Sequence, residues 1–300
     1  MVVTKVVQRK PICYSSIARL FSSSILDEFA TKGWSQTASE IVSASDLECS
    51  IDKFIRLDEF YDRMYLHLFN NYRNEYVYKN ALVEKLLLGK HSLNTSFMLT
   101  EFRSGCCKAD VVLLNGTSHV FEIKTQYDSL DRLEKQIATY AKQFNYIHVL
   151  THECMLDKVS MLVDDDIGLM ILSDRYTLRQ VRKPKSVKNQ TRQDKIFDSL
   201  RKSEYLNIVK ETYGFTPDVP NTQAYKICKK LFCKLNPEIA HDTMVVELKK
   251  RGENNNVKDL VTFAPASLKS LMLSSRFKSS TVKKLRTIFQ SPITDFLSFS

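Results

Sequence analysis

The stretch KADVVLLNGTSHVFEIKTQ, residues 108–126, constrains the fold more than any other part of the chain. Two short apolar runs flank Asn115-Gly116, a pair that strongly favours the tight turn of a β-hairpin. The ends of these runs are charged: Asp110 opens the first run, and Glu122 and Lys124 close the second. A hairpin that only fills a core more often carries uncharged residues at such positions, so these charges need an explanation of their own.

The length of the turn decides whether the charges meet. Side chains alternate along a strand, so Glu122 and Lys124 share a face for any turn. A two-residue Asn-Gly turn places Asp110 and Glu122 on opposite faces. A three-residue loop that includes Thr117, with a bulge, places them directly opposite each other. A site made from both carboxylates therefore requires the three-residue loop.

In that register the two carboxylates lie about 5 Å apart, and their repulsion is costly unless a cation lies between them. Mg²⁺ or Mn²⁺, which prefer oxygen ligands, fit such a pair better than zinc. Lys124, two residues along the same face, is placed to orient a water molecule or to neutralise charge developing on a phosphate. A metal ion, an activated water and a cation are the components of phosphodiester hydrolysis.

The elements around the hairpin predict a compact mixed-sheet α/β domain over residues 76–174. A short helix ending at Gly89 precedes a strand expected near 97–102. After the hairpin, a helix is expected over 128–144, because Leu133, Ile137 and their neighbours recur at helical spacing. The segments YIHVLT and GLMILS then read as buried strands.

Both flanks of this domain are predicted to be helical. Residues 1–75 form an N-terminal flank, with helices over 14–32, ending at Gly33, and over 58–71. Residues 175–192, rich in Arg, Lys, Asn and Gln and without periodicity, form a basic linker. Residues 193–300 form a basic all-α region, with helices expected at 194–213, 222–235, 237–251, 265–275 and 279–290.

The basic charge is concentrated towards the C-terminus. The net charge is +10, and residues 175–300 hold 25 lysines and arginines against 11 acidic residues. A polyanion partner suits this surface, because each neutralised phosphate releases counterions and adds sequence-independent affinity. A solvated lysine-rich surface is the alternative interpretation.

The cysteines and the apolar runs indicate the compartment. Seven cysteines, an odd number without a C-x-x-C pair, predict reduced thiols. Adjacent Cys106 and Cys107 point to opposite faces if their segment is extended, which disfavours a shared metal. The segment after Lys5, Arg9 and Lys10 is too polar for a signal peptide, and no apolar run approaches the roughly 20 residues that cross a bilayer. We expect a cytoplasmic protein without a membrane partner.

The order of Glu84, Ala109-Asp110, Glu122-Ile123-Lys124 and Gln136-x-x-x-Tyr140 resembles the PD-(D/E)XK nuclease superfamily. The Gln-x-x-x-Tyr helix is a feature of its exonuclease-like members. Residues 108–144 are similar to a small bacterial family of largely uncharacterised nuclease-fold proteins. The resemblance covers residues 76–175 and implies a restriction-endonuclease-like mixed sheet flanked by helices.

The resemblance also implies roles for residues of the hairpin. Asp110 and Glu122 would bind Mg²⁺ or Mn²⁺, together with the backbone carbonyl of Ile123. Lys124 would position the attacking water or stabilise the transition state.

The same resemblance assigns residues of the two neighbouring helices. Glu84 would complete the acidic shell, and Glu101, on the strand before the hairpin, competes with it for this role. We favour Glu84, because a helix packed over the sheet can present it inward. Gln136 and Tyr140 are i, i+4 neighbours on the following helix and would hold the lysine or a DNA phosphate.

Other polar residues are expected to be structural. His119 lies in the hairpin on the face away from the proposed site, and the three acids at 164–166 are typical of a solvated turn. The sequence contains no G-x-x-x-x-G-K-S/T phosphate loop, so ATP-driven translocation is not encoded.

The leading expectation is a Mg²⁺-dependent nuclease domain held on nucleic acid, with DNA preferred, by the basic C-terminal region. A restriction or phage-defence setting is typical of stand-alone nucleases of this type. The alternative is a nuclease-fold protein that binds nucleic acid or a protein partner without cleaving it, and a purely structural interaction protein is a third reading. A homo-oligomer and a protein partner both stay open.

Overall fold

The computed structural model describes residues 13–44, 54–91, 93–252 and 255–297. The chain divides into two compact units, one formed by Ala81–Asn255 and the other by Met1–Asn80 together with Asn256–Ser300. The basic residues of the first ten positions and Cys49 lie outside the described residues. Each unit has its own hydrophobic core.

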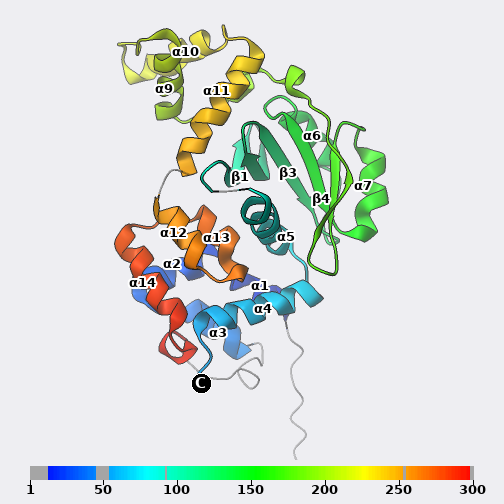
Figure 1. Ribbon diagram of the computed structural model, residues 1–300, viewed down its shortest axis with the longest axis vertical. Helices are drawn as coiled ribbons and strands as arrows, with labels where there is room; N and C mark the ends of the chain where they lie inside the picture. Colours follow the sequence, from blue (N-terminus) through cyan, green and yellow to red (C-terminus); the bar gives the residue numbers. More distant parts are fainter. Residues whose placement is uncertain (1–12, 45–53, 92, 253–254, 298–300) are drawn as a thin grey trace, which may run out of the picture. The chain divides into compact units, whose positions relative to one another are not determined.

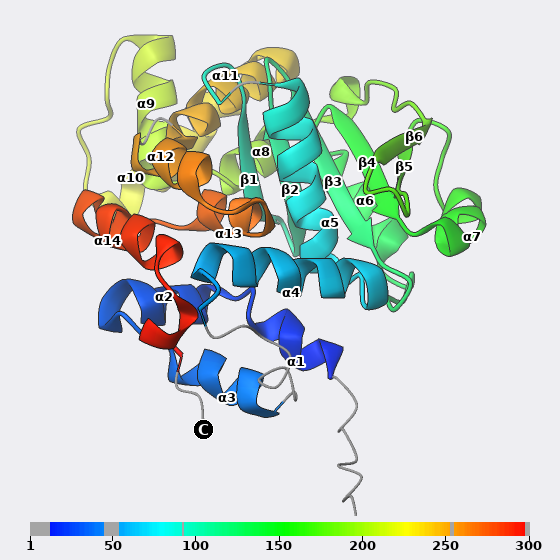
Figure 2. The same cartoon turned by 60° about the horizontal axis from the view of Figure 1, so that its bottom comes forward.

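Unit Ala81–Asn255 is built around a mixed six-stranded sheet whose spatial order follows the sequence (Figures 1 and 2). The first three strands are antiparallel, β3, β4 and β5 are parallel, and β6 is antiparallel to β5. The strands are β1 (Phe97–Ser104), β2 (Cys107–Leu114), β3 (Ser118–Lys124), β4 (Tyr146–Thr151), β5 (Gly168–Leu172) and β6 (Leu178–Arg182). The predicted mixed α/β fold with helices flanking a sheet is confirmed.

The hairpin between β2 and β3 has the three-residue loop. Leu114 pairs with Ser118, and the amide of Asn115 donates to the carbonyl of Thr117 at 3.1 Å. Gly116 occupies the left-handed region at φ 94°, where a side chain would be strained. The ladder runs as far as Val111 opposite Phe121, so the next position along it sets Asp110 across from Glu122.

Helices connect the parallel strands and cover one face of the sheet. Helix α6 (Leu133–Tyr140) lies between β3 and β4, and α7 (Leu156–Leu162) lies between β4 and β5. Ser118 and Glu122 point to the same face because side chains alternate along β3. Glu122 contacts α6, and Ser118 contacts α11 (Pro237–Lys249), so both helices lie on this face.

The opposite face of β3 carries a hydrogen-bonded histidine pair, in which His148 is buried and His119 is half-buried. His119 and His148 share a hydrogen bond of 3.1 Å between Nδ1 and Nε2, and His148 stacks on Phe121 with ring centroids 4.4 Å apart. Burial, and secondarily His91, lowers the pKa of His119 to about 4. Burial, and secondarily His119, lowers the pKa of His148 to about 3. Both rings are therefore neutral in the folded protein at neutral pH.

Residues 128–144 form a shorter helix than the spacing predicts. The side chain of Asp128 accepts from the amide of Thr125 at 2.8 Å, and Ser129 accepts from the amide of Asp131 at 3.1 Å. These side chains stabilise turns, which is their usual alternative to capping a helix. Helix α6 accordingly begins only at Leu133.

The composition predicted that the basic segment 175–192 is a linker, and this prediction is wrong, because part of the segment belongs to the sheet. Residues Leu178–Arg182 form β6, which pairs with β5 as the edge of the sheet, and Lys188–Gln190 form a 3-10 turn. An edge strand exposes most of its side chains, and charged residues there discourage pairing with other chains. The segment therefore lacks the apolar pattern of a buried strand.

The expected C-terminal helical region is divided between the two units. Four of its helices belong with the sheet: α8 (Gln193–Asp198), α9 (Lys202–Tyr213), α10 (Asn221–Phe232) and α11. The helix expected over 194–213 is interrupted at 199–201. Residues 257–297 pack instead with the N-terminal helices, because their apolar faces share one core with them.

Unit Met1–Asn80 with Asn256–Ser300 is helical, and Figures 1 and 2 show its blue and orange-to-red helices together. The ring of Tyr61 packs edge-on against Phe21 at 5.6 Å and Phe289 at 6.4 Å. Asn80 donates to the carbonyl of Ala266 at 2.8 Å. Its helices are α1 (Tyr14–Arg19), α2 (Ser23–Lys32), α3 (Gln36–Ala44), α4 (Leu57–Asn71), α5 (Glu75–Ala81), α12 (Asn255–Phe263), α13 (Lys269–Ser274) and α14 (Ser279–Gln290).

Among the described residues, none of the helices has the length and apolarity needed to traverse a bilayer.

The histidine pair predicts an acid-sensitive fold. Histidine in the unfolded chain has a pKa of about 6.5, so it becomes protonated below that pH. In the folded chain the two histidines stay neutral until the pH approaches their lower pKa values, so acid favours the unfolded state. The free energy of unfolding should fall between pH 6.5 and 4, by about 2 kcal/mol per histidine at pH 5. Urea denaturation at pH 7.5 and pH 5.0 measures this difference.

His148→Leu should reduce the loss of stability between the two pH values, whatever its effect on stability at pH 7.5. His67→Asn, which removes an exposed histidine of α4, is the matched control and should leave the loss unchanged. Equal pH dependence in wild type and His148→Leu contradicts the assignment.

Candidate active site

Three carboxylates occupy facing positions on β1, β2 and β3. The β1–β2 ladder pairs Thr100 with Val111 and Phe102 with Ala109, which leaves Glu101 opposite Asp110. The β2–β3 register then sets Asp110 opposite Glu122. Like charges on facing positions destabilise a sheet, so this row favours a cation.

The backbone is strained at one end of this row. Glu101 has φ 55°, in the left-handed region, and no ladder pair forms between it and Asp110. Such strain costs of order 1 kcal/mol and is found most often at functional sites. Carboxylate oxygens of Glu101 and Asp110 lie within 4.8 Å of each other, and Glu101 also forms an ion pair with Lys108.

The hairpin itself holds Asp110 in place. One carboxylate oxygen, Oδ2, accepts from the backbone amide of Ile123 at 2.7 Å. The predicted role of Ile123 was to offer its carbonyl to a metal, and the bond seen here uses its N–H to orient the aspartate. Asp110 is half-buried, whereas Glu122 is only 2% exposed.

Glu122 accepts hydrogen bonds at both carboxylate oxygens. Lys124 Nζ donates to Oε1 at 2.8 Å, and the side-chain amide of Gln136 also donates to Oε1. Tyr140 donates from its hydroxyl to Oε2 at 2.7 Å. Two of these three donors come from α6, so this carboxylate links the helix to β3.

Tyr140 is a donor and not a base. Burial first, and then the negative charge of Glu122, raise the pKa of Tyr140 well above its ordinary value. The negative charge of Asp110 adds to this effect, which reflects how near the two carboxylates lie to the ring. The hydroxyl therefore keeps its proton.

Lys124 is fixed by its side chain and by its backbone. Its ammonium lies between Glu122 Oε1 and Gln136 Oε1, the latter at 2.9 Å. Its carbonyl accepts from the hydroxyl of Thr151, the facing residue on parallel β4, at 2.7 Å. The lysine is 6% exposed, so these partners take the place of water around its ammonium group.

Five of the six predicted catalytic residues lie close together, and the sixth, Glu84, bonds to residues outside this cluster. Asp110, Glu122, Lys124, Gln136 and Tyr140 lie within one connected cluster. The carboxylate of Glu84 accepts from the hydroxyl of Tyr176, in the turn before β6, at 3.0 Å and pairs with Lys85 at 3.0 Å. The carboxylate placed beside Asp110 on its own sheet is that of Glu101, the candidate that ranked second in the sequence.

The side of the cluster formed by Glu101 and Asp110 suits a hard divalent cation. Glu101 and Asp110 present carboxylate oxygens close together, the ligand type that Mg²⁺ and Mn²⁺ prefer. Glu122 has both oxygens engaged by Lys124, Gln136 and Tyr140. Glu122 joins a metal only when one of these donors shifts.

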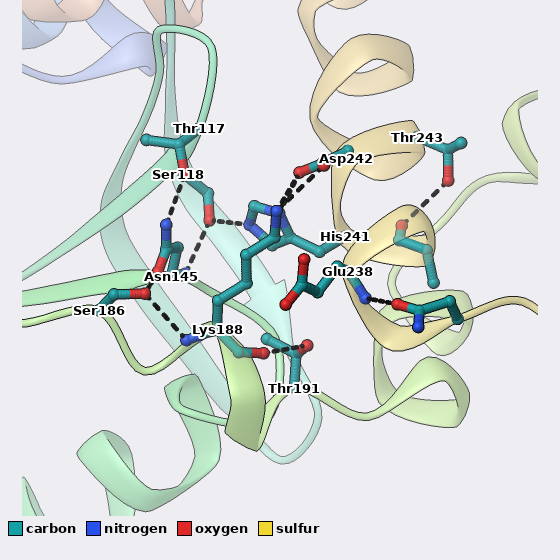
Figure 3. Close-up of polar contacts among 12 residues, drawn as sticks. Thr117, Ser118, Asn145, Ser186, Lys188, Thr191, Glu238, His241, Asp242 and Thr243 are labelled. Carbon is teal, nitrogen blue, oxygen red and sulfur yellow. Dashed lines mark hydrogen bonds and ion pairs between the residues drawn. The ribbon is translucent and has the colours of Figure 1, made fainter.

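A second polar network, absent from the sequence analysis, anchors α11 to the sheet (Figure 3). Ser118 Oγ lies 2.8 Å from His241 Nε2, and His241 Nδ1 lies 3.0 Å from Asp242, which pairs with Lys188 at 2.8 Å. Ser118 also accepts from the amide of Asn145 at 3.0 Å. The sequence carries no signal for this network, because its members are distant along the chain.

This network resembles a hydrolytic triad in composition only. Ser118 and His241 are completely buried, so the hydroxyl is inaccessible to a substrate. Burial is the largest influence on His241 and lowers its pKa, although Asp242 acts in the opposite direction. A neutral imidazole accepts from Ser118 and donates to Asp242, which makes the network a structural connection.

The acids at 164–166 are surface residues with basic partners. Asp165 pairs with Arg182 at 3.1 Å, and Asp166 pairs with Lys185 at 3.2 Å. They connect the turn before β5 to β6 and its following loop.

The residues of this site lie in a part of the chain that matches the profile of a known protein family. The profile of the bacteriophage P4 protein cII family matches residues 68–290, which is more than half of the chain. The chain belongs to this family. The match includes every residue of the cluster and the α11 anchor.

Two individual proteins resemble this cII-family member over shorter stretches. Protein cII of Enterobacteria phage P4 is 32% identical over 63 residues, which are 21% of this chain and 24% of the phage protein. A solved protein of unknown function from Silicibacter pomeroyi is 19% identical over 31% of this chain and 62% of its own, with a TM-score of 0.26. The chain thus spans about a quarter of the curated relative's length.

Removing the buried carboxylate of this cII-family protein should cost stability. Glu122→Ala removes from the buried Lys124 and Tyr140 the carboxylate that accepts from both, which should lower the free energy of unfolding by about 3–5 kcal/mol. Glu153→Ala breaks an exposed pair with Arg179 and should cost less than about 1 kcal/mol. Urea denaturation compares them, and equal losses contradict the importance of the buried carboxylate.

Proposed function

We propose that the unit Ala81–Asn255 is a divalent-metal-dependent nuclease that hydrolyses phosphodiester bonds, with DNA as the favoured substrate. The observation that carries the proposal is the row of Glu101, Asp110 and Glu122 on three strands, with Lys124 on the same face. Acidic residues of this kind, beside a positioned lysine, supply both the ligands and the cation that phosphodiester cleavage needs.

A bound Mg²⁺ would polarise the scissile phosphate and lower the pKa of a coordinated water. Glu101 and Asp110 would hold it, and the amide of Ile123 keeps the aspartate aimed. Lys124, oriented by Gln136, would offset negative charge that develops on the phosphate. Tyr140 keeps Glu122 in place by donating to its second oxygen.

A basic stripe on α10 supports a nucleic-acid partner. Lys226, Lys230 and Lys234 recur every four residues, so they lie along one side of the helix and its C-terminal turn. All three are exposed, and within the described part of the chain no ion pair involves them.

The purified protein should cut nucleic acid with Mg²⁺ or Mn²⁺ and stop when EDTA removes the metal. Glu122→Gln keeps the size of the side chain and removes its charge, and Lys124→Ala removes the cation. Each should lower the cleavage rate by at least about 100-fold. The assay uses single-stranded DNA, duplex DNA and RNA as parallel substrates.

Glu153→Ala is the control for this assay, because its carboxylate lies in an exposed pair. Circular dichroism confirms that every variant is folded. Full cleavage by a folded Glu122→Gln or Lys124→Ala variant rejects the nuclease assignment.

The second candidate function is binding of nucleic acid without cleavage, and one observation favours it. Glu122 is 2% exposed and both its oxygens already accept hydrogen bonds. Binding through α10 would then be salt-sensitive and independent of Asp110 and of metal.

Binding to duplex DNA should weaken linearly in a plot of log affinity against log salt. Lys230→Ala should make this slope less steep by about 1, because one fewer phosphate is neutralised. Lys185→Ala, which removes a cation paired with Asp166, should leave the slope unchanged. Identical slopes for the two variants exclude α10 as the nucleic-acid surface, and absence of binding favours a purely structural role.

Restriction or phage defence in the cytoplasm is the setting we propose for such a nuclease.

A further inference from the structure

Cys106 and Cys107 form a close pair at the turn between β1 and β2. Gly105 adopts φ 56°, which turns the chain so that the two side chains do not diverge as they would in an extended segment. The two sulfur atoms lie 3.8 Å apart. Cys106 is exposed and Cys107 is half-buried at the start of β2.

The two thiols have different surroundings. The thiol of Cys107 lies 3.7 Å from the hydroxyl of Thr139 on α6. The hydrogen bond from Cys107, and secondarily the charge of Lys135, lower the pKa of Cys106, whereas burial raises the pKa of Cys107. The exposed sulfur is therefore the better nucleophile, and its neighbour is shielded.

We propose that Cys106 and Cys107 form a reversible thiol–disulfide pair that exchanges with low-molecular-weight disulfides. The Cys106 thiolate attacks one sulfur of the small disulfide, forms a mixed disulfide and expels the first thiolate. Cys107 then loses its proton and attacks the sulfur of Cys106, which expels the second. Two electrons pass to the small disulfide, and the two protons of the protein thiols end on the two released thiols.

The closed form would be easily reduced. Adjacent Cα atoms are about 3.8 Å apart, less than the 4.4–6.8 Å usual across a disulfide, so the ring is strained. Strained disulfides have the higher reduction potentials typical of switches. The pair directly precedes Lys108, whose carbonyl accepts from Tyr140 at 3.2 Å and whose ammonium pairs with Glu101.

The test treats the full chain with oxidised glutathione and maps the cysteine-containing peptides by mass spectrometry. The wild-type peptide with Cys106 and Cys107 should lose two hydrogens and carry no glutathione. Cys107→Ser should instead keep a stable adduct on Cys106, and Cys106→Ser should leave Cys107 unmodified. Dithiothreitol should restore the wild-type peptide.

Cys13 is the internal control. Hydrogen bonds from Ser15 and Ser16 lower its pKa to about 7, and its described neighbours are hydroxyl groups. It should form a glutathione adduct that persists. A persistent adduct on Cys106 in the wild type, or no reaction at Cys106 while Cys13 reacts, overturns the proposal.

Discussion

The buried carboxylate of Glu122 determines how the sheet and its crossover helix fit together. It is 2% exposed and carries a charge that the core does not tolerate without donors. Lys124 supplies one donor from the same strand, and Gln136 and Tyr140 supply two from α6. Helix α6 therefore packs with this side towards β3, and its buried residues are Leu133 and Tyr140.

The same arrangement shapes the proposed metal site. Because both oxygens of Glu122 already accept hydrogen bonds, our proposal gives the role of metal ligand to Asp110 and Glu101, which are more exposed than Glu122. The hairpin register brings Asp110 to Glu122, and the strained backbone at Glu101 ends the row. The strained backbone of Glu101 and the repulsion between neighbouring carboxylates thus occur at the same place, where a bound cation would reduce the repulsion. Backbone strain is common at functional sites.

Much of this cluster could be predicted from the sequence because its parts are local. Asp110, Glu122 and Lys124 lie in one hairpin, where alternation and turn length fix which side chains share a face. Gln136 and Tyr140 lie four residues apart on the next helix, so they face the same way. The prediction remained conditional only on Thr117, which the structure places in the loop.

Other features depend on contacts that no local pattern encodes. The ranking of Glu84 over Glu101 assumed that the preceding helix presents Glu84 to the site, whereas its carboxylate is bound to Tyr176. Segment 178–182 becomes an edge strand because β5 offers it a partner, although its exposed charges resemble those of a linker. The connection of Ser118 to His241 joins residues more than a hundred positions apart.

The sequence by itself therefore determined the hairpin, the shared face of its charges and the helix that follows. Periodicity and turn chemistry act over a few residues, so they can be read directly from the chain. Only the tertiary structure decided which acid stands beside Asp110 and how the C-terminal helices divide between two cores. These outcomes follow from burial and long-range packing, in which a residue's partner is set by the whole fold and not by its neighbours in sequence.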